Sequence, residues 1–155
     1  MGDASFQFRG YQDGDLEAMF RLDEVCFEAP FRFSRAAMRR FAETKRARVV
    51  LAEIAGELAG FCIVHVERGG VGYVVTLDVA PLWRRQGLAR MLMERGEAAA
   101  REAGCEVMVL HVFDGNEGAV RFSERAGYER VGNDVGFYGE GVDALVYRKG
   151  LESVA

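Results

Sequence analysis

The sequence predicts an α/β (α+β) domain built around one mixed sheet. Segments with strand-like apolar runs alternate with segments of helical apolar spacing, in the order β-αα-βββ-α-β-α-ββ. Half of the residues are hydrophobic and 28% are charged, which is typical of a globular protein. A chain of 155 residues is long enough to bury about 70% of its unfolded surface around one core. We therefore expect a single domain over residues 1–155.

The first half of the chain predicts a strand, two helices and three further strands. Pro30 breaks the first helix, whose early acidic residues suit a helix N-terminus, and Ser34 is a suitable N-cap for the second. The pair Ala55-Gly56 predicts a tight hairpin turn, and Pro81 stops the last of these strands. The expected elements are a strand at residues 6–11, helices at 13–27 and 35–45, two paired strands within 47–67, and a strand at 69–81.

The second half predicts two helices and three strands. Gly104 and Gly127 follow the helices in the usual C-terminal position, and Asn116 or Asp114 caps the second helix. Residues 106–112 are apolar on both faces, which favours a central, covered strand. The expected elements are helices at about 87–103 and 116–127, and strands at 106–112, 128–132 and 143–149, the last two separated by a glycine-rich loop at 133–141.

Composition narrows the classes of function. The formal net charge of −4 argues against a general nucleic-acid binder, and no apolar run approaches the length of about 20 residues that a membrane span needs. We therefore expect neither nucleic acid nor membrane as a partner. The cysteines are odd in number and form no C-x-x-C pair, so we expect neither a disulfide framework nor a metal site. This use of cysteine favours a cytoplasmic location. These cysteines are Cys26, Cys62 and Cys105.

The stretch PLWRRQGLARML (residues 81–92) lies where a strand is expected to end and a helix to begin. A helix N-terminus has unpaired N–H groups and a partial positive charge, which attract phosphate. Gly87 has no side chain to block a close approach, and Ala89 has almost none. Arg84 and Arg85 add charge. The stretch predicts a diphosphate site without a Walker sequence. Taken alone, it also fits a basic loop before a surface helix.

Together with the stretch LHVFDGNEGAVRFSERAGY (residues 110–128), this corner resembles the GCN5-related N-acetyltransferase (GNAT) family, over about residues 6–149. The family's acetyl-CoA motif, Q/R-x-x-G-x-G/A, is matched by Arg84, Gly87 and Ala89, and its second motif by Asn116, Ala119, Gly127 and Tyr128. The sequence is most similar to N-terminal protein acetyltransferases, including those acting on ribosomal-protein alanine. The resemblance implies a mostly antiparallel sheet of about seven strands flanked by about four helices. It also implies a transferase that uses acetyl-CoA as its acetyl donor.

The resemblance assigns the acetyl-CoA contacts mainly to the backbone. The pantetheine arm would pair with a strand edge, and Asn116 would reach it from the second helix. The diphosphate would lie at the start of the first helix after the corner. The implied set is Leu77, Asp78 and Val79 for pantetheine, and Arg85, Gln86, Gly87, Leu88, Ala89 and Arg90 for the diphosphate, with Arg84 close by.

Acetyl transfer to an amine requires that the amine lose a proton. An α-amino group has a pKa of about 7.7–8.0, against about 10.4 for lysine, so a near-neutral base suits an α-amine. His111 lies at the end of its strand and should project to the same face as Val107 and Val109. The resemblance pairs this histidine with Tyr73, as a base that acts through a water. The alternatives are a core histidine bonded to a carbonyl group and a half-buried strand tyrosine.

One position departs from the family pattern. Members often carry a tyrosine seven residues after the asparagine, and this chain has Ser123 there. The short serine side chain is not expected to reach the leaving sulfur directly. A bridging water, Tyr138, or release of the thiolate to solvent would then replace the usual general acid.

For the acceptor amine, the resemblance points to the loops CFEAPFRF (residues 26–33) and GFYGEG (residues 136–141). Their apolar residues would line a small mouth, although ordinary loop packing explains them equally well. The leading hypothesis is transfer to a protein N-terminal α-amine. The alternatives are a small-molecule amine as acceptor and a non-catalytic acyl-CoA-binding domain, and the chain is expected to be a monomer or a homodimer. The implied mouth residues are Phe27, Pro30, Phe31 and Tyr138.

Overall fold

The computed structural model describes residues 5–152. Its elements are β1 (Gln7–Arg9), α1 (Leu16–Cys26), the short 3-10 helix η1 (Ala29–Phe31), α2 (Arg35–Glu43), β2 (Ala47–Ile54), β3 (Glu57–Glu67), β4 (Val71–Val79), η2 (Pro81–Trp83), α3 (Leu88–Glu102), β5 (Val107–Phe113), α4 (Glu117–Arg125), β6 (Glu129–Gly139) and β7 (Val142–Gly150). This sequence of elements confirms the predicted order. None of the helices in the described part of the chain is long and apolar enough to cross a membrane.

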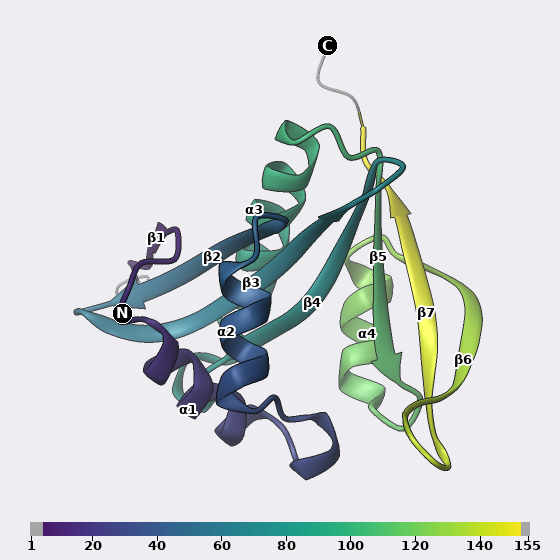
Figure 1. The fold of residues 1–155 in the computed structure, drawn as a ribbon, viewed down its shortest axis with the longest axis horizontal. Helices are drawn as coiled ribbons and strands as arrows, with labels where there is room; N and C mark the ends of the chain where they lie inside the picture. Colours follow the sequence, from purple (N-terminus) through teal and green to yellow (C-terminus); the bar gives the residue numbers. More distant parts are fainter. Residues whose placement is uncertain (1–4, 153–155) are drawn as a thin grey trace.

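The strands form one seven-stranded sheet in the order β1-β2-β3-β4-β5-β7-β6 (Figure 1). Every neighbouring pair is antiparallel except β4 and β5, which run parallel. The mixed, mostly antiparallel sheet that the sequence predicts is therefore confirmed. The parallel pair lies in the middle of the sheet, with α3 as the connection between its two strands.

Helices cover both faces of the sheet (Figure 1). Alternate residues of a strand point to opposite faces, so β2 and β3 contribute to two separate cores. Leu51, Phe61 and Ile63 pack with residues of α1 and α2 on one face, whereas Cys62 and Val64 pack with α3 on the other. In Figure 1, α1 and α2 lie over β2–β4 and leave the same face of β5, β7 and β6 without an α-helix.

Close packing of α3 depends on a glycine in β3. A Cβ atom on Gly60 would lie 2.7 Å from the carbonyl oxygen of Asp78 and 3.0 Å from the side chain of Leu92. No ordinary side chain fits at that distance, so Gly60 lets α3 approach the sheet beside the end of β4. This packing fixes where the N-terminus of α3 lies relative to β4.

Local signals in the sequence appear in the structure where they were expected. Ser34 caps α2 by accepting a hydrogen bond from the N–H of Ala37 at 3.1 Å. Asn116 caps α4 in the same way. Ala55 and Gly56 have φ angles of 52° and 80°, as a two-residue hairpin turn between β2 and β3 requires. These caps and turns involve neighbouring residues, so they form without help from distant parts of the chain.

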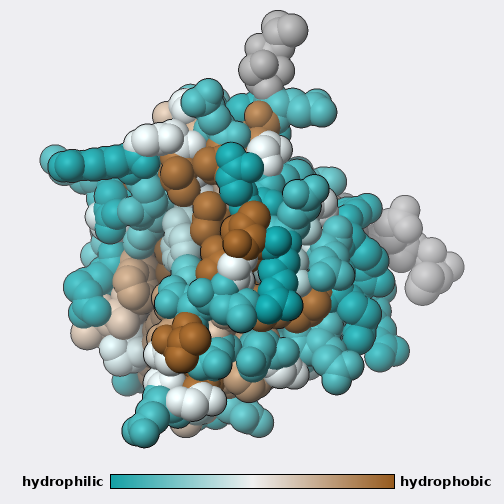
Figure 2. Space-filling view, turned by 90° about the vertical axis from the view of Figure 1, so that its right-hand side faces the viewer, coloured by the Kyte–Doolittle hydropathy of each residue, from teal (hydrophilic) through white to brown (hydrophobic). Residues whose placement is uncertain are grey.

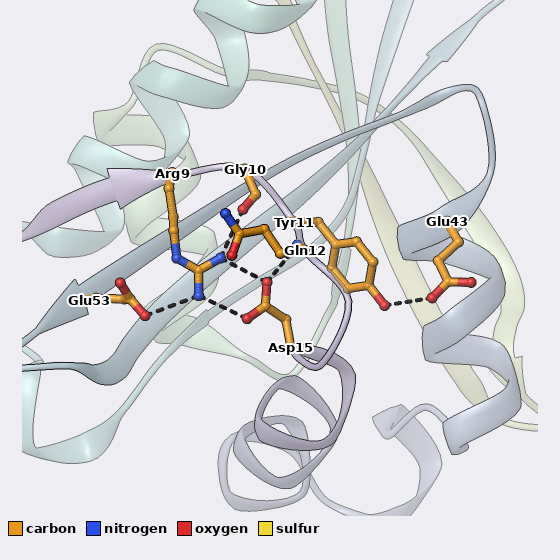
Figure 3. Close-up of polar contacts among 7 residues, drawn as sticks. All are labelled: Arg9, Gly10, Tyr11, Gln12, Asp15, Glu43 and Glu53. Carbon is orange, nitrogen blue, oxygen red and sulfur yellow. Dashed lines mark hydrogen bonds and ion pairs between the residues drawn. The ribbon is translucent and has the colours of Figure 1, made fainter.

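A cluster around Arg9 holds the N-terminal strand to the α1–α2 layer (Figure 3). The Arg9 guanidinium donates two hydrogen bonds of 2.8 Å to Asp15, just before α1, and one of 3.0 Å to Glu53 on β2. This contact lowers the pKa of Asp15. Tyr11 donates a hydrogen bond of 2.6 Å to Glu43 at the end of α2. The cluster therefore joins β1, β2 and both helices of this layer.

The prediction of a glycine-rich loop at residues 133–141 is wrong for most of this segment. Most of this segment belongs to β6, which pairs with β7 as far as Asp134 opposite Ala144 and again at Gly139 opposite Val142. The intervening residues bulge out of the ladder, which an edge strand tolerates and which explains the many glycines. Figure 2, viewed from the β6 side, shows apolar residues in a line among polar ones, and the exposed large apolar residues of β6 are Val131, Val135 and Phe137.

Candidate active site

The parallel strands β4 and β5 pair at one end only. Tyr73 opposite Val109 is the last pair between them. Just beyond this pair, β4 contains a bulge. Val74 and Thr76 pair with two consecutive residues of β3, Val64 and Ile63, so Val75 between them has no partner on β3. Such a bulge bends its strand. The remainder of β4 has no pairing with β5 in the described residues, so a gap reaches the middle of the sheet.

The N-terminus of α3 lies beyond the end of this gap. Arg85 and Gly87 have φ angles of 64° and 79°, and no side chain caps the helix. The first N–H groups of a helix have no acceptor within the helix, so they are available to a ligand. A Cβ atom on Gly87 would meet nothing within 4 Å, so the space in front of the backbone is open. The corner therefore fits an anion such as a diphosphate.

Arg84 lies at the end of β4 and contacts the strand itself. Its Nε donates a hydrogen bond of 3.0 Å to the carbonyl oxygen of Val79, and its guanidinium is 3.6 Å from the sulfur of Cys26. The Cys26 thiol also donates to the Val79 oxygen, at 3.4 Å. Burial, and then the nearby Asp78, raise the pKa of this thiol to about 11. Two donors thus occupy a carbonyl group that was predicted to bind pantetheine.

The second predicted motif lies on α4. The Oδ1 of Asn116 accepts a hydrogen bond of 3.1 Å from the N–H of Ala119, so this side chain caps the helix and keeps its NH2 group for other partners. Ser123 is buried, and its hydroxyl donates to the carbonyl oxygen of Ala119 at 2.8 Å. The hydroxyl proton of Ser123 is therefore used within the helix.

The predicted pair Tyr73 and His111 is in contact where β4 and β5 separate. The Tyr73 hydroxyl lies 2.7 Å from Nδ1 of His111. On the other side of the ring, Nε2 lies 3.1 Å from Oδ2 of Asp134 on β6. The His111 side chain is 14% exposed and that of Asp134 is 50% exposed. Burial raises the pKa of Tyr73 well above its usual value, so its hydroxyl is protonated at neutral pH.

Aromatic rings form one wall beside this pair. Phe31 of η1 lies with its ring centre 5.0 Å from those of both Phe113 and Tyr138. Phe137 stacks on the His111 ring with centres 3.8 Å apart and planes 3° apart. Burial raises the pKa of the Tyr138 hydroxyl to about 12. The structure thus brings together Phe31 and Tyr138 of the four predicted mouth residues.

The other two predicted mouth residues lie at the edge of this group. Pro30 is exposed within η1, and Phe27 is half-buried just after α1. The carbonyl oxygen of Phe27 accepts a hydrogen bond of 2.6 Å from Arg32, which holds the turn between α1 and α2.

Two residues of β6, Asp134 and Phe137, were not among the predicted site residues. Both lie in the segment that was expected to be a loop. The bulge between Asp134 and Gly139 interrupts the alternation of side chains, so no simple sequence period links Asp134 and Phe137 to His111. The contact of Asp134 with His111 also depends on the pairing of three strands, which no local pattern encodes.

A buried pair of carboxyl groups connects α1 to β4. Asp23 is 0% exposed and Asp78 is 1% exposed. One oxygen of Asp23 accepts from the N–H of Phe33 at 2.9 Å, and one oxygen of Asp78 accepts from the hydroxyl of Thr76 at 2.6 Å. The remaining oxygens have no hydrogen-bond partner among the described residues, and Asp23 is close enough to help raise the pKa of Asp78. Two acceptors can bond only through a shared proton, and burial raises the pKa of both groups.

Comparison with known proteins agrees with this geometry. Residues 16–128 match the Acetyltransferase (GNAT) family. A mycothiol acetyltransferase of Propionibacterium freudenreichii is 31% identical over 137 residues, covering 82% of this chain and 44% of the relative. N-alpha-acetyltransferase 30 of Schizosaccharomyces pombe is 32% identical over 91 residues, covering 57% of this chain and 61% of the relative. The chain thus spans less than two thirds of the length of either relative.

Solved structures share the fold along nearly the whole chain. The ribosomal-protein-S18-alanine N-acetyltransferase of Escherichia coli has a TM-score of 0.85 at 20% identity, covering 97% of this chain and 96% of that one. NAA60 of Arabidopsis thaliana, solved in complex with acetyl-CoA, has a TM-score of 0.83 at 20% identity, covering 95% and 99%. At this identity the likeness concerns the fold, whereas the family match covers most of the sequence. The chain therefore belongs to the acetyltransferase (GNAT) family.

Proposed function

We propose that this chain is an acetyl-CoA-dependent N-acetyltransferase that acts on a primary amine, with a protein N-terminal α-amine as its acceptor. Membership of the family supports the reaction type. The observation that carries the proposal is the 2.7 Å contact between Tyr73 and His111 at the point where β4 and β5 separate. A donor bound along this gap would present its acetyl group to these two side chains.

The gap and the corner together fit the shape of acetyl-CoA, which supplies the acetyl group as a thioester. The open edge of β4 at Leu77 and Val79 would hold the pantetheine arm through backbone N–H groups. Residues 85–90 would hold the diphosphate through the first N–H groups of α3. Arg84 keeps the end of β4 in place through the carbonyl group of Val79. The amide NH2 of Asn116 is free to donate to the arm.

Tyr73 and His111 would remove the proton that the amine must lose. An α-amine has a pKa of about 7.7–8.0, so a histidine-based pair can accept its proton near neutral pH. The amine nitrogen forms a bond to the acetyl carbon as the bond from that carbon to sulfur breaks. The amine's proton passes to the pair through a water, and the sulfur leaves as a thiolate.

Tyr138 is the side chain that we propose for protonating the thiolate. The Ser123 hydroxyl donates to a backbone carbonyl group within α4, so its proton is directed into the helix and away from the gap. The phenol of Tyr138 is protonated at neutral pH, since burial raises its pKa to about 12. It also lies in the wall of the site beside Phe31. A tyrosine from β6 would thus take the place of the helix tyrosine that many relatives carry.

The walls of the mouth favour an acceptor with an apolar first side chain. The side chains around His111 are aromatic, and the one carboxylate in contact with the ring, Asp134, is bonded to it. The test is incubation with acetyl-CoA and peptides that differ only in their first residue, followed by mass spectrometry. We expect acetylation at the α-amine of peptides with apolar first residues, and none on matched peptides whose α-amine is blocked. If no peptide gains an acetyl group, the N-terminal proposal is wrong.

A small-molecule amine is the second candidate acceptor. The 31% identity to a mycothiol acetyltransferase over 82% of this chain favours it. Polyamines and amine-bearing antibiotics, assayed beside the peptides, distinguish the two candidates by their kcat/KM values. If CoA raises the melting temperature of the protein and no amine of either class is acetylated, the chain is a non-catalytic acyl-CoA-binding domain and both candidates fail.

A further inference from the structure

We propose that Asp134 is a positioning residue for His111: its carboxylate fixes which ring nitrogen carries the proton and stabilises the imidazolium that forms when the acceptor amine loses its proton. The inference rests on the proposed acetyl transfer at Tyr73 and His111, and it adds a third member to that pair. Asp134 would contact neither acetyl-CoA nor the acceptor amine, and it would act only through the imidazole of His111.

Strand register brings Asp134 to the imidazole across one intervening strand. On β7, Val146 pairs with His111 and Ala144 pairs with Asp134. Directly paired residues project to the same face of a sheet, so all four side chains lie on one face. Ala144 is small, and Asp134 reaches over this part of β7 to Nε2 at 3.1 Å. Figure 1 shows β5, β7 and β6 side by side, with neither α1 nor α2 in front of them.

The carboxylate determines the tautomer of the ring. An ionised carboxylate only accepts hydrogen bonds, so Nε2 of His111 carries the proton that faces Asp134. Nδ1 then has a lone pair, and the Tyr73 hydroxyl donates to it at 2.7 Å. Both ring nitrogens are thereby engaged, and Phe137 covers one face of the ring. The atom with lone pairs still free is the hydroxyl oxygen of Tyr73, which would meet the amine or its bridging water first.

The proton then has a defined route. As the amine's proton arrives at the oxygen of Tyr73, the hydroxyl's own proton moves to Nδ1 of His111. The imidazolium that forms is stabilised by Asp134, whose side chain is 50% exposed, whereas that of His111 is 14% exposed. After the product has left, Nδ1 returns its proton through the Tyr73 hydroxyl to water, which restores the Nε2–H tautomer for the next cycle. Besides Asp134, two titratable groups raise the pKa of Tyr73: Tyr138 on β6 and Glu67 on β3.

The tautomer can be measured without any acceptor. Nitrogen-15 NMR of the imidazoles in the intact, cofactor-free protein distinguishes a proton on Nε2 from one on Nδ1. The chain has two histidines, and His65, whose Nε2 lies 2.8 Å from the carbonyl oxygen of Phe41, provides a reference for the Nε2–H form. A His65→Gln variant assigns the signals. We expect Nε2–H at His111 in the wild type and a population of Nδ1–H in Asp134→Asn, because an asparagine NH2 can donate to Nε2. An unchanged pattern in the variant overturns the proposal.

Kinetics test the consequence for catalysis. Asp134→Asn should lower kcat by about 10- to 100-fold, less than loss of the base itself, while the Kd for acetyl-CoA stays unchanged. Asp134→Glu should recover part of kcat. Glu129→Gln is the matched control, an exposed carboxylate on the same strand, and should behave as wild type.

The outcomes separate this inference from the proposed function. If the wild type acetylates no amine, the proposed function fails, and the NMR result alone decides whether Asp134 sets the tautomer. If the wild type is active and Asp134→Asn retains its kcat and the Nε2–H tautomer of His111, the positioning role is refuted. Melting temperatures of all variants show whether a loss of activity reflects unfolding, and a folded variant with low kcat supports the role.

Discussion

The buried pair Asp23 and Asp78 makes the stability of the fold depend on pH in a direction that can be calculated. We expect the two carboxyl groups to share one proton in the folded protein, because burial and their mutual proximity raise the pKa of Asp78. In the unfolded chain each has a pKa of about 3.9 and is ionised above pH 5. The folded state then binds one more proton than the unfolded state, so the contribution of this pair to stability is complete below the unfolded pKa and is lost as the pH rises toward the raised pKa of Asp78.

The perturbation is Asp78→Asn. The asparagine NH2 can donate to the free oxygen of Asp23, while its oxygen accepts from Thr76 as the carboxylate does. The variant thus keeps both hydrogen bonds and loses the titrating proton. One proton is worth about 1.4 kcal/mol per pH unit, so the free energy of unfolding of the wild type should fall relative to the variant, by at most that amount per unit, as the pH rises from the unfolded pKa toward the raised pKa of Asp78.

The assay is urea unfolding at several pH values, followed by the fluorescence of Trp83, the one tryptophan in the chain. Asp13→Asn, an exposed position, is the matched control and should keep the wild-type slope. Asp78→Ala should be destabilised by about 1–3 kcal/mol, because it leaves one buried oxygen of Asp23 without its neighbouring carboxyl group. Parallel curves for the wild type and Asp78→Asn would refute the shared proton. Arg32 and Glu24 near Asp23, and Arg84 and Cys26 near Asp78, are the other charged or titratable groups, and they are the same in both proteins.

Three further predictions concern the reaction. His111→Ala should lower kcat by about 10²- to 10⁴-fold with little change in the Kd for acetyl-CoA, as measured by steady-state kinetics and calorimetry. Gly87→Glu should weaken CoA binding by at least about 100-fold, because the new carboxylate meets the diphosphate and the residue must keep a φ of 79°; calorimetry with CoA alone checks this. Tyr138→Phe should lower kcat by about 100-fold, and Ser123→Ala should leave kcat unchanged. Equal kcat values for the two variants would contradict the role of Tyr138 as the general acid.

Much of the fold was predictable from the sequence because its signals are local. The cap at Ser34, the turn at Ala55-Gly56 and the glycine after α3 act on their immediate neighbours, and they define the order of the elements. The segment at residues 133–141 was not predictable in this way. Its glycines suit a loop, and only pairing with β7 makes most of it a strand.

The site was predictable in part, for the same reason. The corner at Gly87 and the cap at Asn116 are short motifs, and the resemblance supplied Tyr73 and His111. The contact with Asp134 depends on the register of three strands, and the pair of Asp23 with Asp78 depends on how α1 packs on β4. Long-range packing of this kind leaves no spacing in the sequence that a reader could recognise.

The central claim is that the gap between β4 and β5 and the N-terminus of α3 hold acetyl-CoA with its thioester beside Tyr73 and His111. The most direct test is a crystal structure of the protein with CoA and an acceptor peptide. The account predicts diphosphate oxygens hydrogen-bonded to the N–H groups of residues 85–90, and the sulfur and the peptide α-amine next to the Tyr73 hydroxyl. A diphosphate bound elsewhere, or an amine on the opposite face of the sheet from His111, would contradict it.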